Sequence, residues 1–173
     1  MTDTHVRTLV LARHARAESH AASDVVRELS VEGHADAAAI GRWLAQAGQN
    51  FGAVVSSPST RTRQTWSEIQ AAGVTADNVR FDERVYAGEA ALLLDVLAEI
   101  PERVRKVLVI GHAPAIPELA DLLADPAGSD ASTLGRLRSS FPSGCLAVLR
   151  VGEPWAELTP GSARLLELAT PRA

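Results

Sequence analysis

Cysteine and lysine are nearly absent from this chain of 173 residues, and both absences narrow its chemistry. Cys145 is the one cysteine, so an intrachain disulfide and a metal site built from cysteines are excluded. Lys106 is the one lysine among seventeen basic residues, which leaves a single candidate for a Schiff base. The sequence also lacks a phosphate-binding loop of the G-x-x-x-x-G-K-[ST] type. Nucleophiles and phosphate ligands must therefore be sought among other residue types.

Long apolar runs are missing as well. No stretch approaches the roughly 18 consecutive apolar residues of a membrane span, and the first residues lack the basic-then-apolar pattern of a signal peptide. The net charge of −4 disfavours nucleic acid and anionic membranes as partners, because both reward a basic surface. We expect a cytoplasmic, monomeric protein in which residues 1–173 form one domain, since a hydrophobic share of 46% can build a sizeable core.

Short apolar runs alternate with helical patterns along the chain, which is typical of an α/β layer fold. The last two apolar runs, Cys145–Val151 and Arg164–Ala169, have no helix between them, so we expect them to pair antiparallel at a sheet edge. The other predicted strands are Thr8–Ala12, Ala53–Ser56, Val79–Phe81 and Lys106–Ile110, and the predicted helices span Val31–Ala47, Ser59–Ala72, Glu89–Ile100 and Pro114–Leu123.

Polar residues gather directly after three of these strands. Arg13 and His14 follow the first, Arg61 lies shortly after the second, and His112 follows the fourth. Ligands bind at the carboxyl ends of the strands in open α/β sheets, so we expect these side chains in one crevice. A metal site is not expected, because two histidines without a carboxylate at ligand spacing offer too few ligands. The remaining histidines are assigned structural roles: His5, His20 and His34.

Two histidines and two arginines in one crevice suit phosphoryl transfer. Guanidinium groups bind phosphate oxygens through paired hydrogen bonds and stay charged at any working pH. A neutral imidazole nitrogen is a nucleophile, and neighbouring arginines favour that neutral form. Such a reaction needs no metal or other cofactor, because the arginines supply the positive charge.

Several motifs carry a family resemblance. Leu9–Glu18 (L-V-L-A-R-H-A-R-A-E) resembles the signature of the histidine phosphatase superfamily in the form used by its small SixA-type phosphohistidine phosphatases, with Ala15 in the place of the more familiar Gly. The further motifs similar to that branch are D-x-x-R-x-L-S-x-x-G at Asp24–Gly33, S-S-P-S-T-R-T-R-Q-T at Ser56–Thr65, V-I-G-H-A-P at Val109–Pro114 and F-P-S-G at Phe141–Gly144.

The resemblance implies a three-layer α/β/α sandwich around a mostly parallel sheet of about six strands. It also implies a catalytic role for four residues. His14 would be the phosphorylated nucleophile, and His112 would contact the phosphoryl group. Arg13 and Arg61 would bind the transferred phosphate.

The resemblance leaves the proton donor open. Larger relatives use a carboxylate from the middle of the chain, and here only Glu83 and Glu89 are candidates, without an unambiguous match. Loss of an acid slows the departure of an alkoxide more than that of imidazole, which favours protein phosphohistidine as the substrate. A phosphatase of small phosphomonoesters or nucleotides and a non-catalytic phosphate-binding module are the alternatives. Arg16 is a candidate for attracting an anionic substrate.

Overall fold

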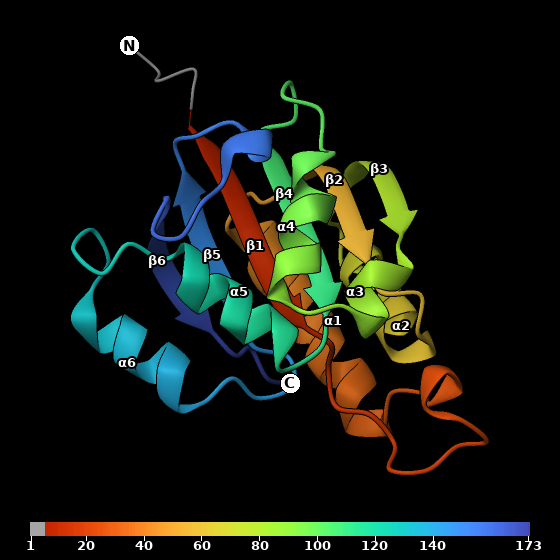
Figure 1. The fold of residues 1–173 in the computed structure, drawn as a ribbon. Helices are drawn as coiled ribbons and strands as arrows, with labels where there is room; N and C mark the ends of the chain where they lie inside the picture. Colours follow the sequence, from red (N-terminus) through yellow and green to blue (C-terminus); the bar gives the residue numbers. More distant parts are fainter. Residues whose placement is uncertain (1–5) are drawn as a thin grey trace.

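One sheet of six strands forms the centre of the computed structural model, which describes residues 6–173 (Figure 1). Its strand order is β3-β2-β4-β1-β5-β6. The first four of these strands are parallel, whereas β5 is antiparallel to both β1 and β6. The strands are β1 Arg7–Arg13, β2 Phe51–Ser56, β3 Ala76–Phe81, β4 Lys106–Gly111, β5 Leu146–Val151 and β6 Ala163–Ala169.

The central strands are apolar on both sides because helices cover both faces of the sheet. Along β1, Leu9 and Leu11 point into one core, and Val10 and Ala12 point into the other. Helices α1 and α2 pack on the second of these cores, while α4, α5 and α6 pack on the first. The helices are α1 Val31–Gln46, α2 Thr60–Ala71, α3 Glu83–Ala87, α4 Ala90–Ala98, α5 Ala115–Leu123 and α6 Ala131–Ser139.

The structure confirms the predicted three-layer α/β/α sandwich and the antiparallel strand pair at the sheet edge. Two helices had no predicted counterpart, namely α3 and α6. Helix α6 buries only Leu134 and Leu137, so its apolar pattern is too sparse to stand out in the sequence. Two 3-10 turns complete the chain, η1 at Asp24–Val26 and η2 at Trp155–Glu157. No helix in residues 6–173 is long and apolar enough to cross a membrane.

Strand register brings the polar motifs to one level. Arg13 at the end of β1 pairs with Gly111 at the end of β4, and Ser56 at the end of β2 pairs with Ile110. The residues that follow these three strands therefore leave the sheet side by side at its carboxyl edge. A cap fixes the next helix: the Ser30 side chain accepts a hydrogen bond from the Gly33 N–H at the start of α1.

Candidate active site

His14 lies one residue beyond β1 and is only 6% exposed. Its backbone N–H donates to the Gly111 carbonyl, which ties it to the end of β4. Its Nδ1 lies 2.6 Å from the Ala15 carbonyl oxygen. Because a carbonyl can only accept, Nδ1 carries the ring proton and Nε2 keeps a lone pair. The Nε of Arg61 donates to that Nε2 at 3.3 Å.

His112 follows β4 and takes the opposite tautomer. Its Nδ1 accepts from Nη2 of Arg61 at 3.2 Å, since a guanidinium can only donate. Its Nε2–H therefore donates to the Ser57 hydroxyl oxygen at 2.8 Å. The ring centroids of His14 and His112 lie 5.3 Å apart. The two imidazoles thus share one arginine and face a common space.

Both imidazoles are neutral near pH 7. Burial lowers the pKa of His14 to about 3. The charges of Arg61 and Arg13, and that of His112 once acid protonates it, act in the same direction, while the bond to Ala15 opposes them. Burial and then Arg61 lower the pKa of His112 to about 4. A neutral His14 with its lone pair on Nε2 is the state in which a histidine is nucleophilic.

The two arginines approach the histidines from different elements. Arg61 sits in the first turn of α2 and is 4% exposed. Arg13 ends β1, and its Nη1 donates to the Phe141 carbonyl at 3.1 Å. The buried Nε of Arg13 has no hydrogen-bond partner in the described chain, and a buried donor without a partner is costly. An anion bound beside Arg13 would satisfy this group.

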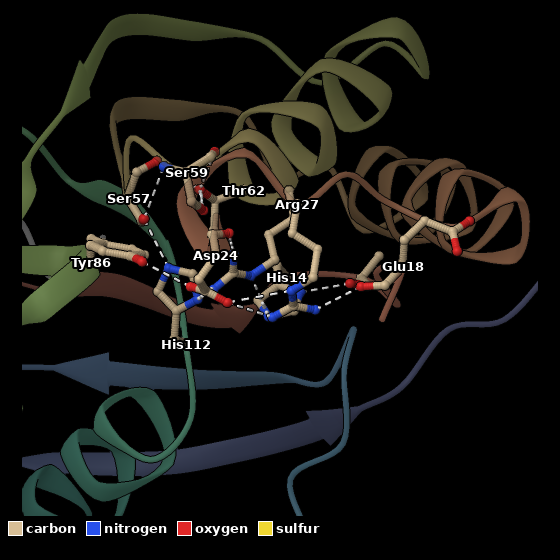
Figure 2. A network of polar contacts seen from close by, with 11 residues as sticks. His14, Glu18, Asp24, Arg27, Ser57, Ser59, Thr62, Tyr86 and His112 are labelled. Atoms are coloured by element: carbon tan, nitrogen blue, oxygen red, sulfur yellow. Dashed lines mark hydrogen bonds and ion pairs between the residues drawn. The ribbon is translucent and has the colours of Figure 1, made fainter. Parts of the chain in front are cut away.

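Two residues of this network had no predicted site role, Asp24 and Tyr86. Figure 2 shows Asp24 between Tyr86 and Arg27. The Asp24 carbonyl and carboxylate accept from Arg61 at 2.8 and 3.0 Å, and the Tyr86 hydroxyl donates to the same carboxylate at 2.8 Å. The Tyr86 ring meets His112 edge-on, with centroids 5.5 Å apart. Asp24 opens the D-x-x-R motif, which was its only sequence signal, and Tyr86 is the sole tyrosine of the chain.

The other candidate residues lie outside these contacts. The Nε of Arg16 donates to Asp36 at 2.7 Å, and within the described residues its half-exposed side chain makes no hydrogen bond to either site histidine. Glu83 begins α3 and Glu89 precedes α4, both exposed. No hydrogen bond joins these two glutamates to the site histidines in the part of the chain described. The structure thus brings His14, Arg61 and His112 into direct contact but not Arg16, Glu83 or Glu89.

The remaining histidines show why isolated histidines carried little weight. His34 on α1 pairs with Glu68 at 2.8 Å, and His20 is exposed in a loop. His5 lies outside the described residues. Within residues 6–173 there is no cluster of three or more His, Cys, Asp or Glu side chains able to hold a metal ion.

Known proteins share this fold and these motifs. Residues 9–88 match the family model of the histidine phosphatase superfamily (branch 1). An uncharacterized protein of Mycobacterium tuberculosis is 34% identical over 161 residues, which cover 92% of this chain and 99% of that protein.

Solved structures extend the likeness to three dimensions. The proposed phosphohistidine phosphatase SixA of Nakamurella multipartitia is 36% identical, with a TM-score of 0.85 over 97% of this chain and 98% of its own. The corresponding Agrobacterium tumefaciens protein is 26% identical, with a TM-score of 0.78 over 95% and 98% of the two chains. This chain belongs to the histidine phosphatase superfamily, in its SixA-type branch, and its activity class is that of a phosphatase.

Proposed function

We propose that this phosphatase removes phosphate from protein phosphohistidine through a covalent phosphohistidine on His14, without a metal ion. The observation that carries the proposal is the state of His14. Its Nδ1 is held protonated by the Ala15 carbonyl, and its Nε2 lone pair faces the Arg61 guanidinium. The nucleophile is thus already hydrogen-bonded to an arginine that can bind phosphate.

In the first step, Nε2 of His14 attacks phosphorus while the bond from phosphorus to the substrate nitrogen breaks. The Nε–H of Arg61 loses its acceptor when Nε2 bonds to phosphorus, and it is then free to donate to a phosphoryl oxygen. The unpartnered Nε of Arg13 supplies a second donor. Fixed donors of this kind stabilise the charge on the transferring group without a metal.

In the second step, water attacks phosphorus and the bond to Nε2 breaks, and the released phosphate keeps both protons of the water. The Ala15 carbonyl matters here, because Nδ1 stays protonated throughout. His14 therefore leaves as a neutral imidazole and needs no acid. His112, whose ring lies 5.3 Å away, would contact the phosphoryl oxygens in both steps.

The choice of phosphohistidine as substrate draws on two supports. The Nakamurella multipartitia protein, with 36% identity, bears the name of a phosphohistidine phosphatase. The exposed candidates Glu83 and Glu89 make no hydrogen bond to the histidines in residues 6–173, so a leaving group that needs little help from an acid suits the site.

Turnover on two substrates tests the proposal. The wild-type protein and His14→Ala are incubated with a phosphohistidine-bearing protein and with 4-nitrophenyl phosphate, in the presence of a chelator. We expect wild type to release phosphate from the phosphohistidine protein faster than from the ester, and His14→Ala to release none from either. Equal rates for the two enzymes would contradict catalysis, and a clear preference for the ester would contradict the substrate.

A further inference from the structure

Asp24 is a charged group in contact with Arg61, and neither step of the proposed reaction uses it. Its side chain is 52% exposed, although its carboxylate is held by three donors from three segments. One oxygen accepts from Arg61 and Tyr86, on α2 and α3. The other accepts two hydrogen bonds, both from Arg27 on its own loop, from Nη2 at 3.0 Å and from Nε at 3.3 Å. Exposed pairs three residues apart contribute little, so a ligand can replace one of these two hydrogen bonds at small cost.

Asp24 cannot serve as the missing acid. Hydrogen bonds from Tyr86, Arg27 and Arg61 hold the pKa of its carboxyl well below its usual range, so it is ionised at every working pH. The groups that interact with it are Arg27, Arg61, Tyr86 and the neutral His112, and Glu83 acts electrostatically on Tyr86. An ionised carboxylate at this place can only accept hydrogen bonds.

The leaving ring of phosphohistidine needs such an acceptor. Its phosphorylated nitrogen departs as part of a neutral imidazole only if the other ring nitrogen carries a proton, and the ring is then cationic before the bond breaks. His14 meets the same requirement through the Ala15 carbonyl when it leaves in turn. In-line displacement puts the substrate ring on the side of phosphorus opposite His14. Asp24 is bonded to Arg61, the arginine that also bonds Nε2 of His14.

We propose that Asp24 determines specificity by accepting a hydrogen bond from the second ring nitrogen of phosphohistidine, which keeps the departing ring protonated. This inference rests on the proposed function. The preferred ligand class is an N-phosphoryl group whose leaving nitrogen system carries positive charge. The leaving group of a phosphate ester carries no positive charge, so the Asp24 carboxylate can only repel the anionic ester.

The test compares Asp24→Asn with wild type on the phosphohistidine protein and on 4-nitrophenyl phosphate. Asparagine keeps an oxygen that can accept from Arg61 and Tyr86 but removes the charge. We expect kcat/KM for phosphohistidine to fall about ten- to hundredfold, the range of one charge-assisted hydrogen bond, and the rate on the ester to hold or rise. Asp121→Asn is the matched control, because it also removes a carboxylate paired with an arginine, on α5.

A pH profile separates this role from support of Arg61. The kcat of wild type on phosphohistidine should decline only well above the pKa of the substrate ring, about 6.5 for free imidazole, and Asp24→Asn should move that decline to lower pH. Asp24→Glu keeps the charge and should recover part of the preference for phosphohistidine.

Three outcomes overturn the proposal. These are an equal loss on both substrates, an unmoved decline in kcat, and failure of Asp24→Glu to recover more preference than Asp24→Asn. Each leaves the proposed function standing if wild type still dephosphorylates the protein. If wild type itself fails on phosphohistidine but hydrolyses the ester, the proposed function fails and takes this inference with it.

Discussion

The amino ends of the parallel strands form one edge of the sheet and their carboxyl ends form another, and the arginines at these two edges differ in their contacts. At the amino edge, a cavity of about 830 Å³ opens beside β2, β3 and the end of α4. Its exposed lining residues Arg103 and Arg105 have no acidic partner among the described side chains, and Lys106 reaches only the Gly48 carbonyl at 3.5 Å. At the carboxyl edge, Arg61 is buried and bonded to both histidines. Many protein surfaces have a cavity and positive charge, so these two features do not identify an active site. A neutral histidine that is hydrogen-bonded to a buried arginine does, and it lies at the carboxyl edge.

The largest difference between the edges should appear when the nucleophile is removed. We expect His14→Ala to lower kcat by about 10⁴-fold or more, because the nucleophile that forms the covalent intermediate is then missing. Arg105→Ala at the amino edge should keep full activity in the same assay with the phosphohistidine protein. Comparable losses from both variants would contradict the assignment of the site to the carboxyl edge.

Arg61→Lys should have the next largest effect. A lysine keeps the charge but cannot bond His14, His112 and Asp24 together through a planar fork. We expect a decrease in kcat of about 10²- to 10³-fold, as for the loss of a fixed donor that stabilises the transition state. Arg103→Lys is the matched change at the amino edge and should leave kcat unaltered in a steady-state assay.

The contrast between the edges also separates what the sequence predicted from what it did not. The central strands are continuous apolar runs, and the polar residues that follow them had to meet at one edge once the strands were parallel. This is why the meeting of His14, Arg61 and His112 in one place could be predicted from the sequence. The missing helix between the last two apolar runs predicted the antiparallel edge pair, and the family resemblance implied the three-layer sandwich.

The network around these residues could not be predicted in the same way. Tyr86 lies on α3, a helix of five residues that buries only Val85. No periodic pattern of apolar residues therefore predicted this helix. The contact of Tyr86 with Asp24 spans 62 positions of sequence and depends on how two loops fold over the sheet edge. Arg16 shows the converse, because its bond to the buried Asp36 depends on the packing of α1 rather than on its distance from His14 in the sequence.

Acid should lower the free energy of unfolding through the two buried histidines at the carboxyl edge. The pKa values of His14 and His112 are about 3 and 4 in the folded protein and about 6.5 in the unfolded chain. The unfolded chain therefore binds more protons as the pH falls below 6.5, and the free energy of unfolding should drop between pH 6.5 and pH 4, by about 4 kcal/mol at pH 5 for the two histidines together. Urea denaturation at pH 7 and pH 5 measures this change. A double variant, His14→Gln with His112→Gln, should show a smaller drop, and an equal drop would contradict the buried neutral state.

The smallest decrease in kcat is expected when the Ser57 hydroxyl, which orients His112, is removed. Ser57→Ala removes the acceptor of the His112 Nε2–H, at 2.8 Å, but leaves the bond from Arg61. The loss of one neutral hydrogen bond should lower kcat about two- to tenfold. Ser140→Ala, an exposed serine beyond α6, is the control and should not change kcat. A loss for Ser57→Ala as large as that for His14→Ala would show that the serine takes part in the chemistry itself.

The most direct measurement traps the phosphorylated enzyme. Wild type and His14→Ala are mixed with the phosphohistidine-bearing protein, with and without a chelator, quenched in alkali within one turnover and digested for mass spectrometry. The expected result is one phosphoryl group on His14, stable to alkali and lost in acid, in equal amount with the chelator and absent from the variant. Release of phosphate at the wild-type rate with the label on another residue, or with no label at any time, would contradict catalysis through His14.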